Sequence, residues 1–218
     1  MFRDTRLVIY DLDGVLIDGT EAILRAFRLT LREIGVDSDD DEIRSLIGMS
    51  FVDVLERVLP EERRGEFWRL RDRYIHHFQE GDRGMIKLKP GVEETLRIIH
   101  GMGCMQSVAT NKTGSEAERI LSGLGVMDML DLIVGFLDVP KPKPAPDMIL
   151  HTLEMLGVDR RQAVFVDDTA FGLKAGVEAG VKTVGILTGY HSREQLMEMQ
   201  PDYIIDSMHE LQQLLSKR

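Results

Sequence analysis

The feature that most constrains the fold of this chain is a regular alternation of short apolar runs and longer amphipathic stretches. Short apolar runs suit buried strands, whereas apolar residues repeated every three or four positions suit helices. The expected strands are residues 7–10, 105–109, 131–134, 163–166, 183–187 and 203–205, and the expected helices are 91–102, 114–124, 146–156, 170–179, 192–199 and 207–216. This alternation predicts βαβ units and therefore an α/β fold with a doubly wound, Rossmann-like, mainly parallel sheet.

One segment interrupts the alternation. Only helical patterns occur between residues 20 and 80, at 20–34, 40–47, 51–59 and 61–79. We therefore predict an all-helical domain of residues 18–85 inserted into a core of residues 1–17 and 86–218. Asp18 is expected to be the N-cap of the first inserted helix. The arginine-rich stretch 61–77 is either a solvated helix face or a source of cations for an anionic substrate.

The composition limits the class of protein and its partners. Hydrophobic residues make up 43% of the chain and charged residues 29%, as in a soluble globular protein. The net charge of −10 disfavours nucleic acid as the main ligand. No run reaches the roughly 18 apolar residues of a membrane span, and the N-terminus lacks the apolar region of a secretory signal. We expect a cytoplasmic protein without a membrane or nucleic-acid partner, and the sequence leaves its oligomeric state open.

Charged and polar side chains follow the predicted strands where each strand ends. In chain order they are Asp11, Asp13, Thr110, Asn111, Lys112, Lys141, Lys143, Asp167 and Asp168. Ligands of a doubly wound sheet bind at the carboxyl ends of its strands, so these residues are expected to form one site.

The four carboxylates of this set would repel one another and raise each other's pKa if nothing offset their charge. A hard divalent cation bound by oxygen atoms removes that repulsion, and Mg²⁺ commonly binds one or two carboxylates together with a substrate phosphate. Lysine and threonine side chains in the same set suit a phosphoryl group, whose negative charge needs neutralising. The sequence therefore predicts a Mg²⁺-dependent site for a phosphorylated substrate.

Four motifs occur in order at these strand ends: DLDGVLID, VATN, KPAPD and VDDTAFGLKAGVEAG. Together they resemble the motifs of the haloacid dehalogenase (HAD) superfamily, in the subgroup with a helical C1-type cap inserted after the first motif. The resemblance covers essentially the whole chain. It is closest to phosphoglycolate phosphatases and their pyrophosphatase-like neighbours, and the fourth motif also resembles β-phosphoglucomutases.

The resemblance implies catalytic roles. Asp11 would be the nucleophile that forms an aspartyl-phosphate. Asp13 would protonate the leaving oxygen and then activate water as a base. Thr110 and the backbone N–H of Asn111 would bind phosphoryl oxygens. Lys143 would balance the charge, and it fits the KPxP pattern better than Lys141 does.

The resemblance also implies binding roles. The phosphate- or substrate-binding candidates are Leu12, Gly14, Asn111 and Lys112, and the metal candidates are Asp11, Asp13, Asp167 and Asp168. Gly14 would permit a sharp turn and close approach of the backbone to phosphate. Lys112 is either a substrate contact at the rim or a solvated lysine. Asp13 would contribute its backbone carbonyl, and Asp167 would reach the metal directly or through water.

The acid at position 13 bears on the reaction, because relatives that cleave carbon–halogen or carbon–phosphorus bonds lack it. The preferred hypothesis is a Mg²⁺-dependent phosphatase of a small phosphorylated metabolite. The alternatives are a β-phosphoglucomutase-type mutase, an inorganic pyrophosphatase and a catalytically silent binding protein. The mutases carry a histidine and an arginine at the places of Ile23 and Phe51, so these two residues favour the phosphatase.

Overall fold

The core of the molecule is a six-stranded sheet. The computed structural model describes residues 2, 4–81 and 84–216. Its strands are β1 (Leu7–Tyr10), β4 (Met105–Thr110), β5 (Leu132–Gly135), β6 (Ala163–Asp167), β7 (Lys182–Ile186) and β8 (Tyr203–Ile205). They lie in the order β5-β4-β1-β6-β7-β8, and every neighbouring pair is parallel. The predicted doubly wound α/β fold is confirmed, with β1 between the two halves of the sheet.

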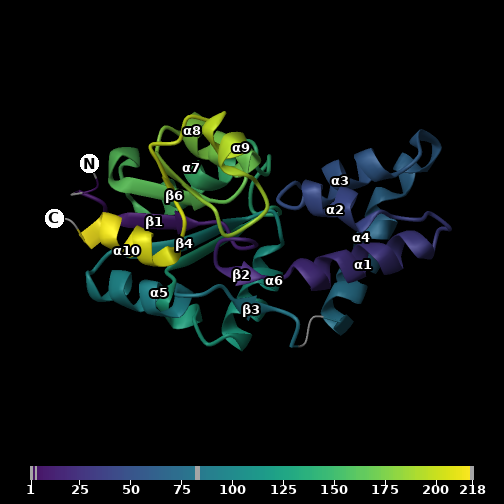
Figure 1. Cartoon of the computed structure of the whole chain (residues 1–218), viewed down its shortest axis with the longest axis horizontal. Coiled ribbons are helices and arrows are strands. Elements are labelled where there is room, and N and C mark those ends of the chain that lie inside the picture. The colour runs from purple at the N-terminus through teal and green to yellow at the C-terminus, as the bar shows by residue number, and fades with distance from the viewer. Residues whose placement is uncertain (1, 3, 82–83, 217–218) are drawn as a thin grey trace.

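Helices cover both faces of this sheet (Figure 1). Along β1, Leu7 and Ile9 pack into one buried cluster, whereas Val8 and Tyr10 pack into the other. The first cluster includes helices α7 (Asp147–Leu156) and α8 (Ala170–Ala179), and the second includes α5 (Val92–Gly101), α6 (Gly114–Gly123) and α10 (Met208–Ser216). The remaining core elements are α9 (Arg193–Met197) and the 3₁₀ turns η2 (Met127–Met129) and η3 (Arg160–Gln162). Burial on both faces explains why β1 reads as the continuous apolar run LVIY.

The chain between β1 and β4 contains a separate group of helices, which we call the helical insertion. It comprises α1 (Thr20–Arg32), α2 (Asp40–Leu46), α3 (Phe51–Val58), the 3₁₀ segment η1 (Glu61–Glu66) and α4 (Phe67–Gly81). These helices lie at one end of the molecule, beyond the sheet (Figure 1). Phe27, Phe51 and Tyr74 hold three of them together, with ring centroids 4.6 to 5.5 Å apart.

The sequence predicts one helix over 61–79, but the structure has η1 before α4. Pro60 directly precedes the segment and Gly65 lies within it, and glycine disfavours a continuous α-helix because it loses the most backbone entropy.

Two short strands join the helical insertion to the core. Strand β2 (Ile17–Asp18) pairs antiparallel with β3 (Lys87–Leu88), so that Ile17 lies opposite Leu88 and Asp18 opposite Lys87. The sequence does not predict this pairing, because two-residue strands are too short to show alternation. No helix within the described residues is long and apolar enough to cross a lipid bilayer.

Candidate active site

The candidate residues meet where the central strands end. Asp11 directly follows β1, Thr110 is the last residue of β4, and Asp167 is the last residue of β6. Strands β4 and β6 are the two neighbours of β1, so all three residues lie at the carboxyl edge of the sheet. The topology alone therefore brings together residues that are far apart in the sequence.

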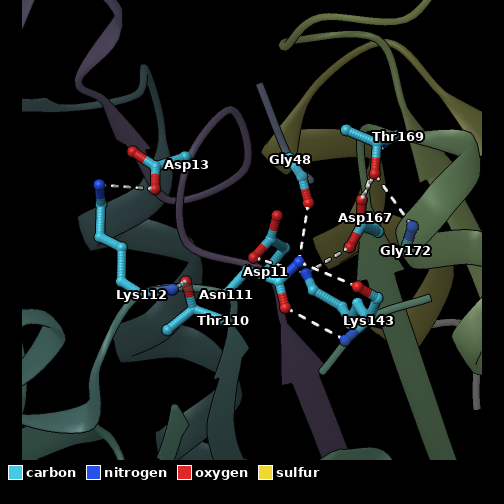
Figure 2. A network of polar contacts seen from close by, with 10 residues as sticks. All are labelled: Asp11, Asp13, Gly48, Thr110, Asn111, Lys112, Lys143, Asp167, Thr169 and Gly172. Carbon is cyan, nitrogen blue, oxygen red and sulfur yellow. Dashed lines mark hydrogen bonds and ion pairs between the residues drawn. The ribbon is translucent and has the colours of Figure 1, made fainter. Parts of the chain in front are cut away.

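Lys143 forms ion pairs with both carboxylates of this group, those of Asp11 and Asp167 (Figure 2). Its Nζ lies 2.7 Å from Asp11 Oδ1 and 2.9 Å from Asp167 Oδ2, and its side chain is only 1% exposed. Lys141, the alternative in the same loop, is exposed to solvent. The structure thus places Lys143, and not Lys141, beside the expected nucleophile.

Asp167 is held by the first turn of α8. Its Oδ1 accepts hydrogen bonds from the backbone N–H and the hydroxyl of Thr169, both at 2.8 Å, and the Thr169 oxygen caps the helix by accepting from Gly172 N–H at 3.0 Å. A Cβ at position 172 would lie 1.7 Å from Asp167 Oδ2, so only glycine fits there. The DDTxxG pattern therefore fixes the carboxylate that orients Lys143.

Asp11, Asp167 and Asp168 form a buried acidic cluster in which one oxygen from each lies within 4.8 Å of the others. Asp168 Oδ2 accepts a hydrogen bond from Tyr190 N–H at 2.8 Å, while its buried Oδ1 has no hydrogen-bond partner among the described residues. Gly14 has φ +84°, and a Cβ there would lie 2.3 Å from Asp168 Oδ2. The turn after β1 therefore packs against the cluster at a glycine, which has no side chain to prevent the close approach.

Burial governs the ionisation of this cluster. Burial raises the pKa of Asp11 to about 7, against the opposing effect of the Lys143 ammonium. The pKa of Asp168 is raised well above its usual range, first by burial and then by the charges of Asp167 and Asp11. A raised pKa means that the surroundings do not offset the negative charge of the ionised carboxylate. A divalent cation would offset it, so these oxygen donors suit such an ion.

Asp13 faces a different partner from Asp11 (Figure 2). Its Oδ2 lies 3.3 Å from Lys112 Nζ, and its buried Oδ1 has no hydrogen-bond partner within the described chain. Lys112 also lies 3.7 Å from Glu116 in the first turn of α6. Burial lowers the pKa of the Lys112 ammonium, but the two carboxylates outweigh burial and keep that pKa above its ordinary value. Of the two interpretations of Lys112, the solvated lysine is wrong, because its side chain is only 10% exposed.

Sequence reasoning missed Glu116. Its side chain is 6% exposed, its Oε1 accepts no hydrogen bond from the described residues, and burial raises its pKa against the opposing charge of Lys112. The only available signal was its place four residues after Lys112, the spacing of an ion pair on one helix face.

The Asn111 side chain connects three parts of the molecule, a role the sequence does not indicate. Its Oδ1 accepts from Lys143 N–H at 3.1 Å, and its Nδ2 donates to the carbonyls of Lys143 at 3.1 Å and Gly48 at 3.0 Å. Lys143 belongs to the loop after β5, and Gly48 lies between α2 and α3 of the helical insertion. The Asn111 amide therefore connects both the loop that contains Lys143 and the helical insertion to the end of β4.

Two further predicted residues, Leu12 and Asp18, lie in and after the turn that follows β1. The prediction that Asp18 is the N-cap of the first inserted helix is wrong by one position, because pairing with Lys87 makes Asp18 part of β2 and leaves Gly19 as the N-cap. Asp18 Oδ1 still accepts hydrogen bonds from the N–H (3.3 Å) and hydroxyl (2.9 Å) of Thr20. The Leu12 side chain is fully buried, so only its backbone can face a ligand.

The helical insertion closes a cavity over this edge of the sheet. Asp11, Asp13, Thr110 and Lys112 line it from the core, together with Glu116. The insertion contributes mainly apolar side chains and one arginine, namely Ile23, Phe27, Ile43, Leu46, Ile47, Met49, Phe51, Val54, Arg71, Tyr74 and Ile75. The acidic edge therefore faces a largely apolar cavity between the sheet and the helical insertion.

Comparison with known proteins identifies the family. The pattern described as haloacid dehalogenase-like hydrolase matches residues 8–186, which is most of the chain. The chain belongs to the haloacid dehalogenase-like hydrolase family. This result confirms the resemblance drawn from the four motifs and the prediction that the protein is a hydrolase.

Individual members of the HAD family match along almost the full length. Phosphoglycolate phosphatase of Aquifex aeolicus is 32% identical over 96% of this chain and 96% of its own. IndB of Dickeya dadantii, described as a probable phosphatase, is 32% identical over 94% of this chain and 91% of its own. The solved structure of a HAD-like family hydrolase of Streptococcus pneumoniae superposes with a TM-score of 0.87 at 25% identity, covering 98% of this chain and 99% of that one.

Proposed function

We propose that this HAD-family hydrolase is a Mg²⁺-dependent phosphatase that hydrolyses a small phosphorylated metabolite through an aspartyl-phosphate, in the manner of phosphoglycolate phosphatases. The observation that carries the proposal is the placement of Asp11. It lies buried at the end of the central strand, in contact with the Lys143 ammonium, and it lines the cavity beneath the helical insertion. A carboxylate so placed can attack a phosphorus atom whose negative oxygens a lysine helps to neutralise.

The metal requirement follows from the donor set. Within the described site, five buried carboxylates face two ammonium groups, and the buried Oδ1 of Asp168 has no hydrogen-bond partner. Asp11, Asp168 and the backbone carbonyl of Asp13 would hold Mg²⁺. Asp167 would support the site from behind, since both of its oxygens already accept hydrogen bonds. Bound Mg²⁺ would neutralise charge on the phosphoryl oxygens.

Asp11 would carry out the phosphoryl transfer, and Asp13 would carry out the proton transfers. Asp11 forms a bond to phosphorus as the bond to the leaving oxygen breaks, and Asp13 gives its proton to that oxygen. Water then attacks the phosphorus, Asp13 takes the proton of that water, and inorganic phosphate leaves as Asp11 is regenerated. The Thr110 oxygen accepts a hydrogen bond from Lys112 N–H at 3.2 Å, so its own proton is free to bind a phosphoryl oxygen.

The helical insertion would act as a cap that restricts the leaving group. Closure would let its apolar residues exclude bulk water from the cavity, which would strengthen the electrostatic interactions at Asp11 and Lys143. Residues 18–85 would open and close about the two short strands β2 and β3. A cavity covered in this way would suit small phosphometabolites and reject phosphoproteins.

The mutase alternative relies on a histidine and an arginine at two positions that are apolar in this cavity. Ile23 and Phe51 both line the cavity, and Phe51 stacks on Phe27 with ring centroids 5.5 Å apart. Neither side chain can donate a hydrogen bond to a second phosphate, so a bisphosphate intermediate would have no anchor at these positions. Discharge of the aspartyl-phosphate by water is therefore favoured over return to a sugar.

The test is a screen of the purified protein against small phosphometabolites, with Mg²⁺ and with excess EDTA. We expect Mg²⁺-dependent release of inorganic phosphate and at least a hundredfold lower turnover by Asp11→Asn. An Asp11→Asn variant with more than about a tenth of the wild-type rate, equivalent to about 1.4 kcal/mol of barrier, would rule out the aspartyl-phosphate. Full activity in EDTA would rule out the metal, and faster conversion of β-glucose 1-phosphate to glucose 6-phosphate than phosphate release would favour the mutase.

A further inference from the structure

Among the residues that the structure describes, the carboxylate of Asp13 forms one ion pair, with the Lys112 ammonium. Its Oδ2 lies 3.3 Å from Lys112 Nζ, and no described residue donates a hydrogen bond to its buried Oδ1. The side chain of Asp13 is thus held from one side only. Its rotamer therefore depends on where the Lys112 ammonium lies.

Lys112 is held by groups from three parts of the molecule. Its Nζ lies 3.3 Å from Asp13 after β1, 3.7 Å from Glu116 on α6, and 4.3 Å from the ring centroid of Phe78 on α4 of the helical insertion. An ammonium group has three N–H donors, and two carboxylates and one ring face match them in number. These contacts fix the ammonium beside Asp13 and leave it little freedom to follow a substrate.

The place of Glu116 on α6 would ordinarily serve the helix itself. Thr113 is the N-cap and accepts a hydrogen bond from Glu116 N–H at 3.2 Å, and a glutamate at this spacing typically returns a hydrogen bond to the N-cap in a capping box. Within the described chain, Glu116 does not make that return bond. Its carboxylate instead lies beside Lys112 and lines the cavity, with its side chain 6% exposed. The Glu116 side chain therefore serves the ammonium and not the helix terminus.

The proposed reaction needs a fixed Asp13. Its carboxylate must give a proton to the leaving oxygen and then take one from water, and a general acid or base works only within hydrogen-bond reach of the atom concerned. Displacement of a reacting group by about 1 Å can lower the rate about 100-fold. A carboxylate held by one ion pair would lose its placement if the ammonium of that pair moved.

We propose that Lys112 and Glu116 are positioning residues: Glu116 fixes the Lys112 ammonium, and the ammonium holds the Asp13 carboxylate at the cavity for both proton transfers. This inference rests on the proposed phosphatase function, because it assigns those transfers to Asp13. Lys112 thus contacts the acid–base group, whereas the resemblance implies a contact with the substrate. Glu116, which none of the four motifs includes, is the residue that keeps the lysine in place.

Rapid-mixing kinetics with 4-nitrophenyl phosphate and Mg²⁺ test the proposal. Nitrophenolate leaves without a proton, so a misplaced Asp13 spares formation of the aspartyl-phosphate and slows its hydrolysis, in which Asp13 acts as base. Lys112→Met and Glu116→Gln should therefore lower kcat about 10- to 100-fold and change kcat/KM by less than about threefold. Both variants should release a burst of nitrophenol near one equivalent per enzyme, and mass spectrometry should find the phosphorylated protein.

A second substrate and a matched variant separate positioning from other effects. The leaving oxygen of an alkyl ester such as 2-hydroxyethyl phosphate needs a proton, so Lys112→Met and Glu116→Gln should lower its kcat/KM about 10- to 100-fold. Glu118→Gln removes an exposed carboxylate from the same helix and should behave as wild type with both substrates. An equal loss of kcat/KM for both substrates, or a raised KM with unchanged kcat, would show a substrate contact or a merely structural role and overturn the proposal.

Thermal unfolding in excess EDTA tests the contact without turnover. The melting temperatures of Lys112→Met, Asp13→Asn and the double variant form a double-mutant cycle. The change in the double variant should differ from the sum of the two single changes by at least about 2 °C, because side chains in contact are energetically coupled. Additive changes would overturn the positioning of Asp13 by Lys112. Failure of wild type to hydrolyse any phosphate ester, with the coupling intact, would instead overturn the phosphatase function.

Discussion

Replacement of Asp11 by asparagine is expected to make the metal-free protein more stable at alkaline pH while abolishing phosphatase activity. Burial raises the pKa of Asp11 to about 7, which means that the folded protein disfavours the ionised carboxylate. Asparagine has nearly the same shape, and its Oδ1 can still accept the hydrogen bond that Lys143 donates at 2.7 Å. The variant therefore keeps the packing and loses the unfavourable charge.

The magnitude follows from the difference in pKa between the folded and unfolded chain. A carboxyl group with a pKa near 4 in the unfolded chain and about 7 in the folded protein binds more protons when folded. The free energy of unfolding of the wild type therefore falls as the pH rises from about 4 to about 7, and is level above that range. A difference of about three units corresponds to about 4 kcal/mol at most, so we expect Asp11→Asn to gain about 2–4 kcal/mol at pH 8 and about 1 kcal/mol at pH 5.

Urea unfolding in excess EDTA measures this difference. Far-ultraviolet circular dichroism is the suitable probe, because the single tryptophan, Trp68, is 65% exposed in the folded protein. Asp11→Ala is the matched control, since it removes the charge but also the hydrogen bond to Lys143 and the packed volume, and it should gain less. The reasoning is refuted if Asp11→Asn is no more stable than wild type at pH 8, or if its gain is the same at both pH values.

Two other predictions concern the metal and the Asn111 amide. Saturating Mg²⁺ should raise the melting temperature of wild type by several degrees, as measured by calorimetry, and should not raise that of Asp168→Asn; an equal rise would place the metal elsewhere. Asn111→Ala should lower the free energy of unfolding by about 2–4 kcal/mol in urea, because three hydrogen bonds to backbone groups of Lys143 and Gly48 are lost. A loss below about 0.5 kcal/mol would mean that water replaces the amide without penalty.

Most elements of the fold could be predicted because their signal is local. Helix α8 matches the predicted 170–179, and β1 and β8 match the predicted 7–10 and 203–205. In each case the hydrophobic pattern of a few neighbouring residues reflects burial against the sheet or its covering helices. Strands β2 and β3 lack such a signal, since their pairing depends on residues about 70 positions apart and on only two residues in each strand.

Some features of the candidate site could likewise be predicted from the sequence, and others could not. Asp11, Thr110 and Asp167 could be grouped from the sequence because one topological rule brings strand ends together. The contacts of Asn111 could not, since its partners are backbone atoms 32 and 63 residues away and no side chain marks them. The position of Arg71 over the cavity depends on how α4 packs on the other inserted helices, which the charge pattern of 61–77 does not specify.

The β2–β3 pairing also bears on how sequences of this fold can change. Ile17 and Leu88 lie side by side, so the chain leaves the sheet and returns to it at nearly one point. Whatever lies between those two residues can grow, shrink or be exchanged without moving β1, β4 or β6, because closing a longer loop from fixed ends costs little extra entropy. Under the proposed function, the edge of the sheet that carries Asp11 and the helical insertion that covers it can therefore diverge at different rates. A graft of another helical segment between Ile17 and Leu88 is a direct route to new specificity on the same chemistry.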